Sequence, residues 1–334
     1  MSLDVVVPDL LLPRQAPAEL RALRLPHLER WIARGRRERI DLPGTSAWLA
    51  TQFALDSPWP VAAVTLAADA GPREGQWLRA DPVHLRVGNE AVTLHDASVL
   101  EVHRDEASAL VGTLQRHFAA DGLEFVAAYP SRWYVRVPES EVPRTTSLED
   151  AVGRNVFGLL PRGEGRINWG GAITETQMLF AEHPVNVERE ARGRPAINSV
   201  WFWGEGLAPD RVASPYESVY ADDAFARGLA RLSGARLAES PVDPERVDSV
   251  EPGHSALVVL DSLTGPLRRG DSAAWLKSAG HLDEKWFAHM PRLLERFEAV
   301  RIVLPSHHET RLSTIDPGAR WRWFRARVPL NADA

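Results

Sequence analysis

Short apolar runs alternate with amphipathic segments along much of the chain. Runs with the length and composition of strands lie at residues 3–7, 61–67, 216–220, 254–261 and 300–304, and an alternating run at 321–328 predicts a closing strand. Segments with helical periodicity lie at residues 17–38, 46–53, 222–232 and 282–297, the last with a break at Pro291. Apolar strands separated by helices predict an α/β fold with a mostly parallel sheet flanked by helices.

The middle of the chain has a different pattern, which is typical of a compact β-β-α-β-β unit. Its predicted elements lie at residues 85–87, 91–94, 105–120, 123–127 and 133–137. Gly88 and Asn89, between the first two strands, are a hairpin signal. We therefore expect a small α+β lobe at residues 81–149, inserted into a main α/β domain formed by residues 1–80 and 150–334.

The stretch from Glu175 to Gly206, called the central stretch below, combines polar and aromatic residues. A helical run that ends at Pro184 is followed by a strand-like run at residues 197–203. Polar side chains beside apolar ones are costly unless they are hydrogen-bonded, so this stretch forms either a satisfied buried network or a site. We expect a ligand pocket whose lining includes Glu175, Gln177, Glu182, His183, Asn186, Asn198, Trp201 and Trp203.

Several of these residues also have a structural interpretation. Glu175 and Glu182 are seven residues apart and share one helical face, which could simply face solvent. His183 could cap a helix end, where a protonated imidazole suits the helix dipole. Asn186 and Asn198 could brace two loops, because a buried asparagine must find hydrogen-bond partners. The sequence leaves both interpretations open.

Arg79 and Asp81 belong to the same predicted binding site. They lie two residues apart in the extended run Trp77–His84, so their side chains face the same side. An ion pair between them is the first interpretation, and a contact with a substrate or partner is the second.

Acidic and histidine residues follow three of the predicted strands. Asp9 and Asp261 come directly after strands, and His307 and His308 follow the strand at residues 300–304. Ligands gather at the carboxyl ends of strands in open α/β sheets, which makes these four residues the candidate metal ligands. An aspartate there can also be a turn residue, and paired loop histidines are commonly exposed.

Composition narrows the classes of function. The 334-residue chain has a formal net charge of −6 and a pI of about 6.0, which argues against a nucleic-acid-binding protein. The absence of cysteine excludes disulfides, thiolate nucleophiles and cysteine-ligated zinc. No run is long enough to span a bilayer and none has the form of a signal peptide, so we expect a cytoplasmic protein with a small-molecule or protein partner and no membrane partner.

Nearly all positive charge in the chain is carried by arginine, because lysine occurs only at positions 277 and 285. The arginines are spread along the chain rather than clustered. We interpret this as a compositional bias, and a phosphate-recognising surface is the alternative.

Several short motifs together resemble one family of proteins. They are Trp77–His84, Arg132-Trp133-Tyr134, Gln177-Met178-Leu179, His183-Pro184-Val185-Asn186, Asn198-Ser199-Val200-Trp201 and Trp203-Gly204. The resemblance is to a proteobacterial family labelled cofactor-independent phosphoglycerate mutase-like, or regulatory proteins of the Rpf pathogenicity cluster, E type. It implies an alkaline-phosphatase-like α/β fold and a two-metal phosphotransfer site.

The chain departs from the motifs that the mutase label implies. Asp9 is followed by Leu10, where true mutases have Asp-Gly after the first strand. Asp81 and His84 are one residue too close for the Asp-x-x-x-His motif, and the region around His307 lacks an Asp-His-Gly turn. A two-metal site needs several carboxylates and histidines with a serine or threonine nucleophile. The recognisable ligand set is therefore incomplete.

Two hypotheses follow for the function. In the first, the protein is a regulatory or small-ligand-binding relative of the mutases. In the second, it is a phosphoryl-transfer or phosphoester-hydrolysing enzyme with a divergent site, which would require a divalent metal such as Mn or Zn. Under the first hypothesis, Asn198→Ala and Gln177→Ala should weaken ligand or partner binding more than they lower the melting temperature. A docking site formed by exposed tryptophans is a third option, although aromatic residues usually stabilise cores.

Overall fold

A computed structural model describes residues 1–12, 16–88, 91–251, 253–322, 324–327 and 329–330. The chain divides into two compact units. The first combines Met1–Asp56 with Arg211–Ala334, and the second is Ser57–Asp210. The second unit extends beyond the expected lobe at residues 81–149 on both sides, because its sheet also uses residues before and after that segment.

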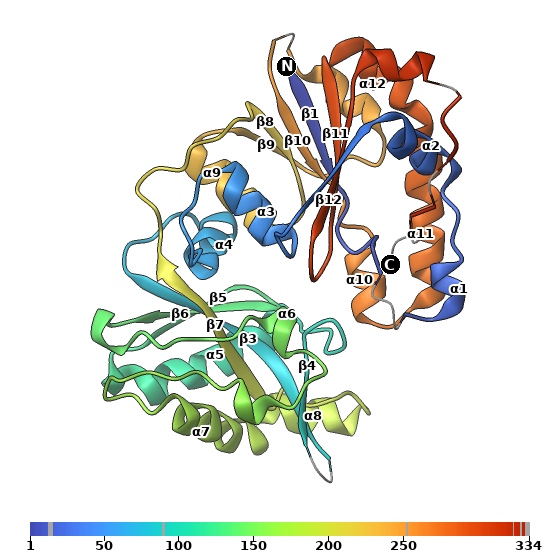
Figure 1. Ribbon diagram of the computed structural model, residues 1–334. Coiled ribbons are helices and arrows are strands. Elements are labelled where there is room, and N and C mark those ends of the chain that lie inside the picture. The colour runs from blue at the N-terminus through green and yellow to red at the C-terminus, as the bar shows by residue number, and fades with distance from the viewer. Residues whose placement is uncertain (13–15, 89–90, 252, 323, 328, 331–334) are drawn as a thin grey trace. The chain divides into compact units, whose positions relative to one another are not determined.

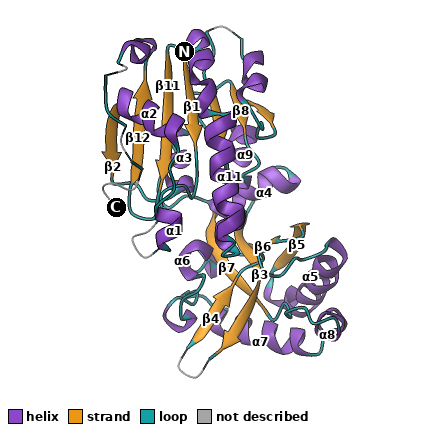
Figure 2. Ribbon diagram, turned by 90° about the vertical axis from the view of Figure 1, so that its right-hand side faces the viewer, coloured by secondary structure: helices purple, strands orange, loops and turns teal. Residues whose placement is uncertain are grey.

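The first unit is built on a seven-stranded sheet. Its strands lie in the order β2 (Arg36–Ile40), β12 (Thr310–Ile315), β11 (Ala299–Pro305), β1 (Ser2–Val6), β10 (Ala256–Val259), β8 (Ser218–Tyr220) and β9 (Arg236–Ala238). The five strands from β11 to β9 are parallel, whereas β12 and β2 pair antiparallel at one edge. Figure 2 views these strands side by side, with β2 at the left edge. The predicted α/β fold with a mostly parallel sheet is confirmed.

Helices cover both faces of this sheet (Figure 1). One face carries α2 (Pro26–Arg34), α11 (Ser272–Lys285) and α12 (Met290–Arg296), and the other carries α3 (Thr45–Gln52) and α9 (Ala224–Ser233). Short helices complete the unit: α1 (Ala18–Arg21), α10 (Thr264–Arg268), η4 (Pro244–Ser249), η5 (Phe287–His289) and η6 (Pro317–Trp321). The core under α2, α11 and α12 is continuous with the apolar side chains of β1, β10 and β11. This burial of apolar surface stabilises the layered arrangement.

The second unit has a five-stranded antiparallel sheet. Its strands are β3 (Gln76–Val87), β4 (Val92–His95), β5 (Glu124–Tyr129), β6 (Arg132–Val137) and β7 (Ser199–Leu207). β3 pairs with β4, β6 and β7, and β6 also pairs with β5. Its helices are α4 (Val61–Ala70), α5 (Arg104–Phe118), α6 (Leu148–Ala151), α7 (Trp169–Ala181) and α8 (Pro184–Ala191), with short turns η1 (Ala119–Asp121), η2 (Glu139–Glu141) and η3 (Val156–Gly158). Separate apolar clusters lie on the two sheet faces, one under α4 and one under α5 and α7.

Three predicted elements differ from the structure. Residues 61–67 form helix α4 rather than a strand, because the segment is apolar on every side and alanine-rich, so periodicity cannot identify it. The helix predicted at residues 17–38 ends at Arg34, and the charged residues after Gly35 pair with β12 as strand β2. The described residues of 321–328 form no strand.

The helix break predicted at Pro291 is displaced in the structure, and the predicted hairpin is present. The predicted break in the helix at 282–297 exists, but it lies at η5, and Pro291 is in the first turn of α12, where its missing N–H costs nothing. The hairpin between β3 and β4 is confirmed by its register, whereas Asn89 lies outside the described residues. Of the helices in the described part of the chain, none is long and apolar enough to cross a bilayer.

Candidate functional site

The two asparagines of the central stretch hold backbone segments together. Asn186 is 2% exposed, and its amide nitrogen donates to the carbonyl oxygens of Phe180 and Ile197, both at 2.8 Å. Its Oδ1 accepts from the Ile197 N–H at 2.9 Å. Asn198 accepts from the Leu85 N–H at 2.7 Å and donates to the Leu85 carbonyl at 2.9 Å. These are the bracing contacts of the structural interpretation.

The other polar residues of the central stretch lie on or beside helices α7 and α8. Glu175 is exposed and pairs with His117 Nε2 at 2.7 Å, Glu182 is exposed, and Gln177 is half-buried. His183 caps the start of α8, where its Nδ1 accepts a backbone hydrogen bond at 3.3 Å, and burial lowers its pKa. Pro184 therefore begins a helix, whereas the sequence pattern placed it at the end of one. A ligand pocket here stays a prediction.

Arg79 and Asp81 form a buried ion pair, which was the first of their two interpretations. Arg79 Nε and Nη2 donate to Asp81 Oδ1 at 3.0 and 2.7 Å, and Trp203 Nε1 donates to Asp81 Oδ2 at 2.8 Å. The guanidinium carbon lies 5.2 Å from the ring centroid of Trp203 and 5.4 Å from that of Tyr134. Burial raises the pKa of Asp81, while Arg79 acts in the opposite direction.

A second ion pair lies beside the first. Arg132 Nε and Nη2 donate to the two carboxylate oxygens of Asp69 at 2.7 Å, and the Tyr134 hydroxyl donates to one of them at 2.7 Å. Two arginines thus face two aspartates, and every carboxylate oxygen has a partner. Trp201 is fully buried and donates Nε1 to the Thr146 carbonyl at 2.9 Å. The polar groups of this cluster are satisfied within the protein, as in a stabilising network.

Asp9 and Asp261 follow parallel strands β1 and β10 and therefore lie at the same edge of the larger sheet. Burial, reinforced by the carboxylates of Asp223 and Asp222, raises the pKa of Asp261 to about 6. The carboxylate of Asp9, which follows β1, also raises the pKa of Asp261. The edge therefore gathers negative charge, as strand ends of α/β sheets that bind cations do.

His307 and His308, the other two candidate metal ligands, are exposed on the turn between β11 and β12. Within the described residues, no three or more histidine or acidic side chains are arranged so that they could hold a metal ion. A two-metal phosphotransfer centre needs several such ligands. The side chains present therefore do not fit the two-metal site that the family resemblance implies.

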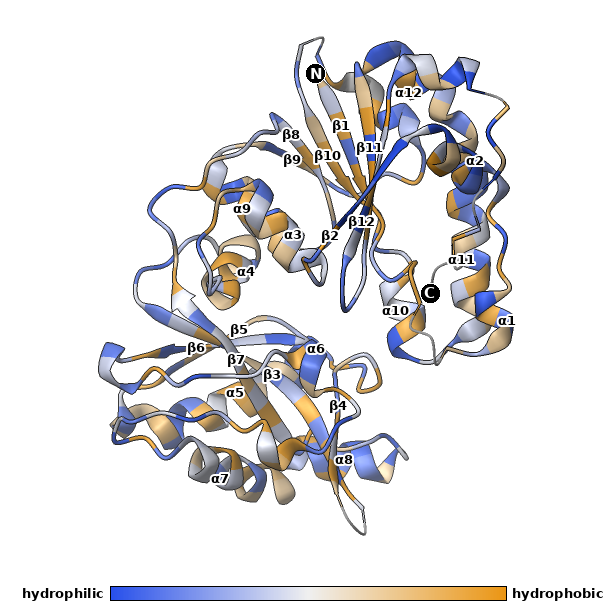
Figure 3. Ribbon diagram, in the orientation of Figure 1, coloured by the Kyte–Doolittle hydropathy of each residue, from blue (hydrophilic) through white to orange (hydrophobic). Residues whose placement is uncertain are grey.

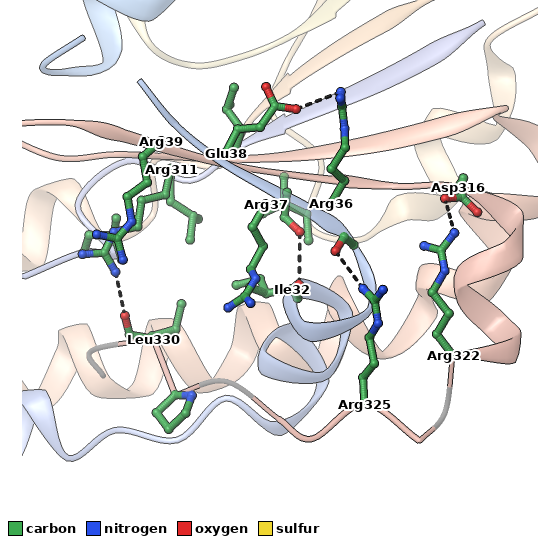
Figure 4. Close-up of a pocket in the computed structure, with 17 residues that line it drawn as sticks. Ile32, Arg36, Arg37, Glu38, Arg39, Arg311, Asp316, Arg322, Arg325 and Leu330 are labelled. Atoms are coloured by element: carbon green, nitrogen blue, oxygen red, sulfur yellow. Dashed lines mark hydrogen bonds and ion pairs between the residues drawn. The ribbon is translucent and has the colours of Figure 1, made fainter. Parts of the chain in front are cut away.

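A pocket of about 800 Å³ lies in the first unit beside strands β2 and β12 (Figure 4). Its size is within the usual range for small-molecule sites. The charged lining residues are Arg36, Arg37, Glu38, Arg39, Arg311, Asp316, Arg322 and Arg325. The apolar lining residues are Leu11, Ile32, Ile302, Leu304, Leu312, Pro329 and Leu330. Six arginines against two carboxylates make this a candidate anion site.

The alternation of strand β2 directs its arginines to two sides. Figure 4 shows Arg37 and Arg39 projecting to the side of the sheet where Arg311 lies, while Arg36 turns toward Glu38 on the other side. Successive residues of a strand face opposite sides, so the sequence dictates this separation. These arginines were not among the predicted site residues, because the segment was predicted to belong to a helix over residues 17–38.

The arginines of the pocket differ in how far they are neutralised. Arg311 pairs with Glu309 at 2.7 Å, and Arg322 pairs with Asp316 at 2.7 Å. Arg37 has no hydrogen-bond or ion-pair partner for its side chain among the described residues. Its exposed guanidinium is therefore available to an anionic ligand.

The chain is similar to proteins with one shared name, although no family model matches it. It is 28% identical over 144 residues to the 2,3-bisphosphoglycerate-independent phosphoglycerate mutase of Methanosarcina mazei, a match that covers 42% of this chain and 36% of that protein. It is 23% identical over 327 residues to a probable mutase of the same name from Geobacter sulfurreducens, covering 88% of this chain and 81% of that protein.

A solved structure, of the PH0037 protein from Pyrococcus horikoshii, has a similar fold. It superposes with a TM-score of 0.56 at 13% sequence identity and covers 94% of this chain and 87% of that chain. The chain is thus phosphoglycerate-mutase-like in sequence, and its α/β architecture agrees with the alkaline-phosphatase-like fold that the resemblance implies. The match to the Methanosarcina mazei protein spans only about a third of that protein's length.

Proposed function

We propose that this chain is a phosphoglycerate-mutase-like protein that binds a small organic anion and acts as a regulatory or ligand-binding protein in the cytoplasm. The observation that carries the proposal is the arginine-lined pocket beside β2. Its guanidinium groups match phosphate and carboxylate oxygens in geometry and charge. Relatives named for a reaction of phosphorylated substrates support this choice of ligand, and the resemblance to Rpf-cluster proteins supports a regulatory role.

Binding is favoured over phosphoryl transfer because the side chains needed for the transfer do not come together. The described residues offer no group of three acidic or histidine side chains for a metal ion. Asp9 and Asp261 share an edge of the sheet, but His307 and His308 are exposed on a turn. We therefore assign no metal-dependent step to these residues. An arginine site can hold an anion without a metal.

The proposal is tested by calorimetric titration with ethyl phosphate, together with a mutase assay in manganese. We expect saturable binding that falls about tenfold or more in Arg37→Ala, because a charge-assisted hydrogen bond contributes about 1.5–3 kcal/mol. Arg236→Ala is the matched control, since Arg236 is exposed on β9 at the opposite edge of the same sheet. Mutase turnover with bound manganese, or equal losses in both variants, would overturn the proposal.

A further inference from the structure

We infer that the ligand of the arginine pocket is an amphiphilic organic phosphate, whose anionic head lies at β2 and whose apolar body lies over β11. This inference rests on the proposed function, because it specifies the ligand class of the same site. It follows from the strand register, from the apolar floor and from the distribution of charge.

The register arranges the pocket residues in rows that cross three strands. Leu304 on β11 lies opposite Arg311 on β12, which lies opposite Arg39 on β2. The next row runs from Ile302 through Ser313 to Arg37. Directly opposed residues in antiparallel strands present their side chains on the same face. Each row therefore begins with an aliphatic side chain and ends with a guanidinium at the sheet edge.

The apolar end of the pocket is continuous with the core of the first unit. Ile302 and Leu304 are 0% and 3% exposed, and both belong to the cluster that also contains Leu11 and Leu330. Ile32 of α2 packs against this cluster and is only partly buried. Figure 3 shows the same contrast along the sheet, with hydrophobic colour on β1, β10 and β11 and hydrophilic colour on β2. Ile32, Leu11 and Leu330 keep some exposed surface, so the apolar part of a ligand that filled the pocket would lie against them, above Ile302 and Leu304.

The polar end concentrates positive charge on one side of the sheet. Arg39 and Arg311 lie directly opposite each other, which brings two guanidinium groups to this end of the pocket, and Arg311 also pairs with Glu309. Arg325 also lines the pocket and donates hydrogen bonds to the backbone carbonyls of Ala33 and Gly35 at 3.4 Å, which carry no charge to neutralise it. Glu38 pairs with Arg36 on the far side. The pocket side therefore suits a phosphate.

Charged edge strands have a general role, because they prevent edge-to-edge pairing with other sheets. That role would account for exposed arginines on β2. It does not account for an apolar floor of Ile302 and Leu304 beside them, or for a pocket of about 800 Å³, far larger than an inorganic phosphate. An amphiphile uses both parts of the pocket.

The inference is tested by titrating the intact protein with ethyl, butyl and hexyl phosphate below their micelle concentrations. Each buried methylene adds about threefold to fourfold in affinity, so hexyl phosphate should bind at least tenfold more tightly than ethyl phosphate. Ile32→Ala should weaken hexyl phosphate binding about threefold or more and leave ethyl phosphate binding unchanged. Ile40→Ala is the matched control, because Ile40 lies on β2 outside the pocket lining.

The outcomes separate this inference from the proposed function. If all three phosphates bind with equal affinity and Arg37→Ala weakens the binding of each, the inference of an amphiphilic ligand is wrong, whereas the proposed anion binding is supported. If none of them binds, both fail. A final experiment tests co-sedimentation of the protein with phosphatidic acid vesicles. Co-sedimentation that Arg37→Ala abolishes would identify the ligand as a membrane lipid. Tight binding of hexyl phosphate without co-sedimentation would identify it as a soluble organic phosphate.

Discussion

Asp261 is half-buried at the end of β10, near the carboxylates of Asp223 and Asp222. Burial and these neighbours raise its pKa to about 6, above the usual value near 3.9. The folded state therefore binds more protons than the unfolded state between about pH 4 and pH 6. The free energy of unfolding therefore falls as pH rises through that window. At pH 7 the Asp261 carboxylate is ionised and its full destabilising effect is present.

Replacing Asp261 by asparagine should remove this penalty. We expect Asp261→Asn to raise the free energy of unfolding by about 1–2 kcal/mol at pH 7 and to change it little at pH 4, after allowance for partial solvent screening. Urea denaturation at both pH values measures the difference, with Asp121→Asn on the surface as control. A variant that is less stable than the wild type at pH 7 would show that the carboxylate makes a favourable interaction there.

At the scale of elements, Asn186 and Asn198 connect segments by satisfying their backbone groups. Asn186 joins the end of α7 to the start of β7, and Asn198 joins β7 to β3 through Leu85. A buried backbone group without a partner costs about 1–3 kcal/mol. Both asparagines therefore stabilise the second unit.

Truncating either asparagine should destabilise the protein rather than weaken ligand binding. We expect Asn186→Ala to lower the free energy of unfolding by about 2–4 kcal/mol and Asn198→Ala by about 1–3 kcal/mol. Gln177→Ala, at a half-buried position on α7, should change it by less than about 0.5 kcal/mol. Chemical denaturation followed by tryptophan fluorescence provides the values. Unchanged stability in both asparagine variants would restore the interpretation of these residues as ligand contacts.

Much of the element pattern could be predicted from the sequence, and the exceptions have local causes. Helical periodicity identified α5, because that helix buries one face, and alternation identified β6, whose Trp133, Val135 and Val137 lie on the same face of the sheet. α4 has no polar face to fix its period, so the same apolar run is compatible with strand and helix. β2 is fully polar on its exposed side, and only its pairing with β12 makes it a strand.

At the scale of the whole molecule, sequence similarity and side-chain geometry indicate different functions. The similarity is to mutases, whereas the side chains that a two-metal centre requires are not gathered within the described residues. The sequence placed Asp9 and Asp261 correctly at strand ends, since that follows from the strands alone. It could not place Arg311 beside Arg37 and Arg39, because Arg311 lies about 270 residues further along the chain and meets them only through the register of β2 and β12.

The most direct test of this account is a crystal structure of the protein grown with hexyl phosphate and manganese, with anomalous data collected for the metal. The account predicts the phosphate group within hydrogen-bonding distance of Arg37, the alkyl chain over Leu304, and no anomalous peak between Asp9 and Asp261. A manganese peak at those aspartates with the phosphate bound to it, and an empty arginine pocket, would contradict it.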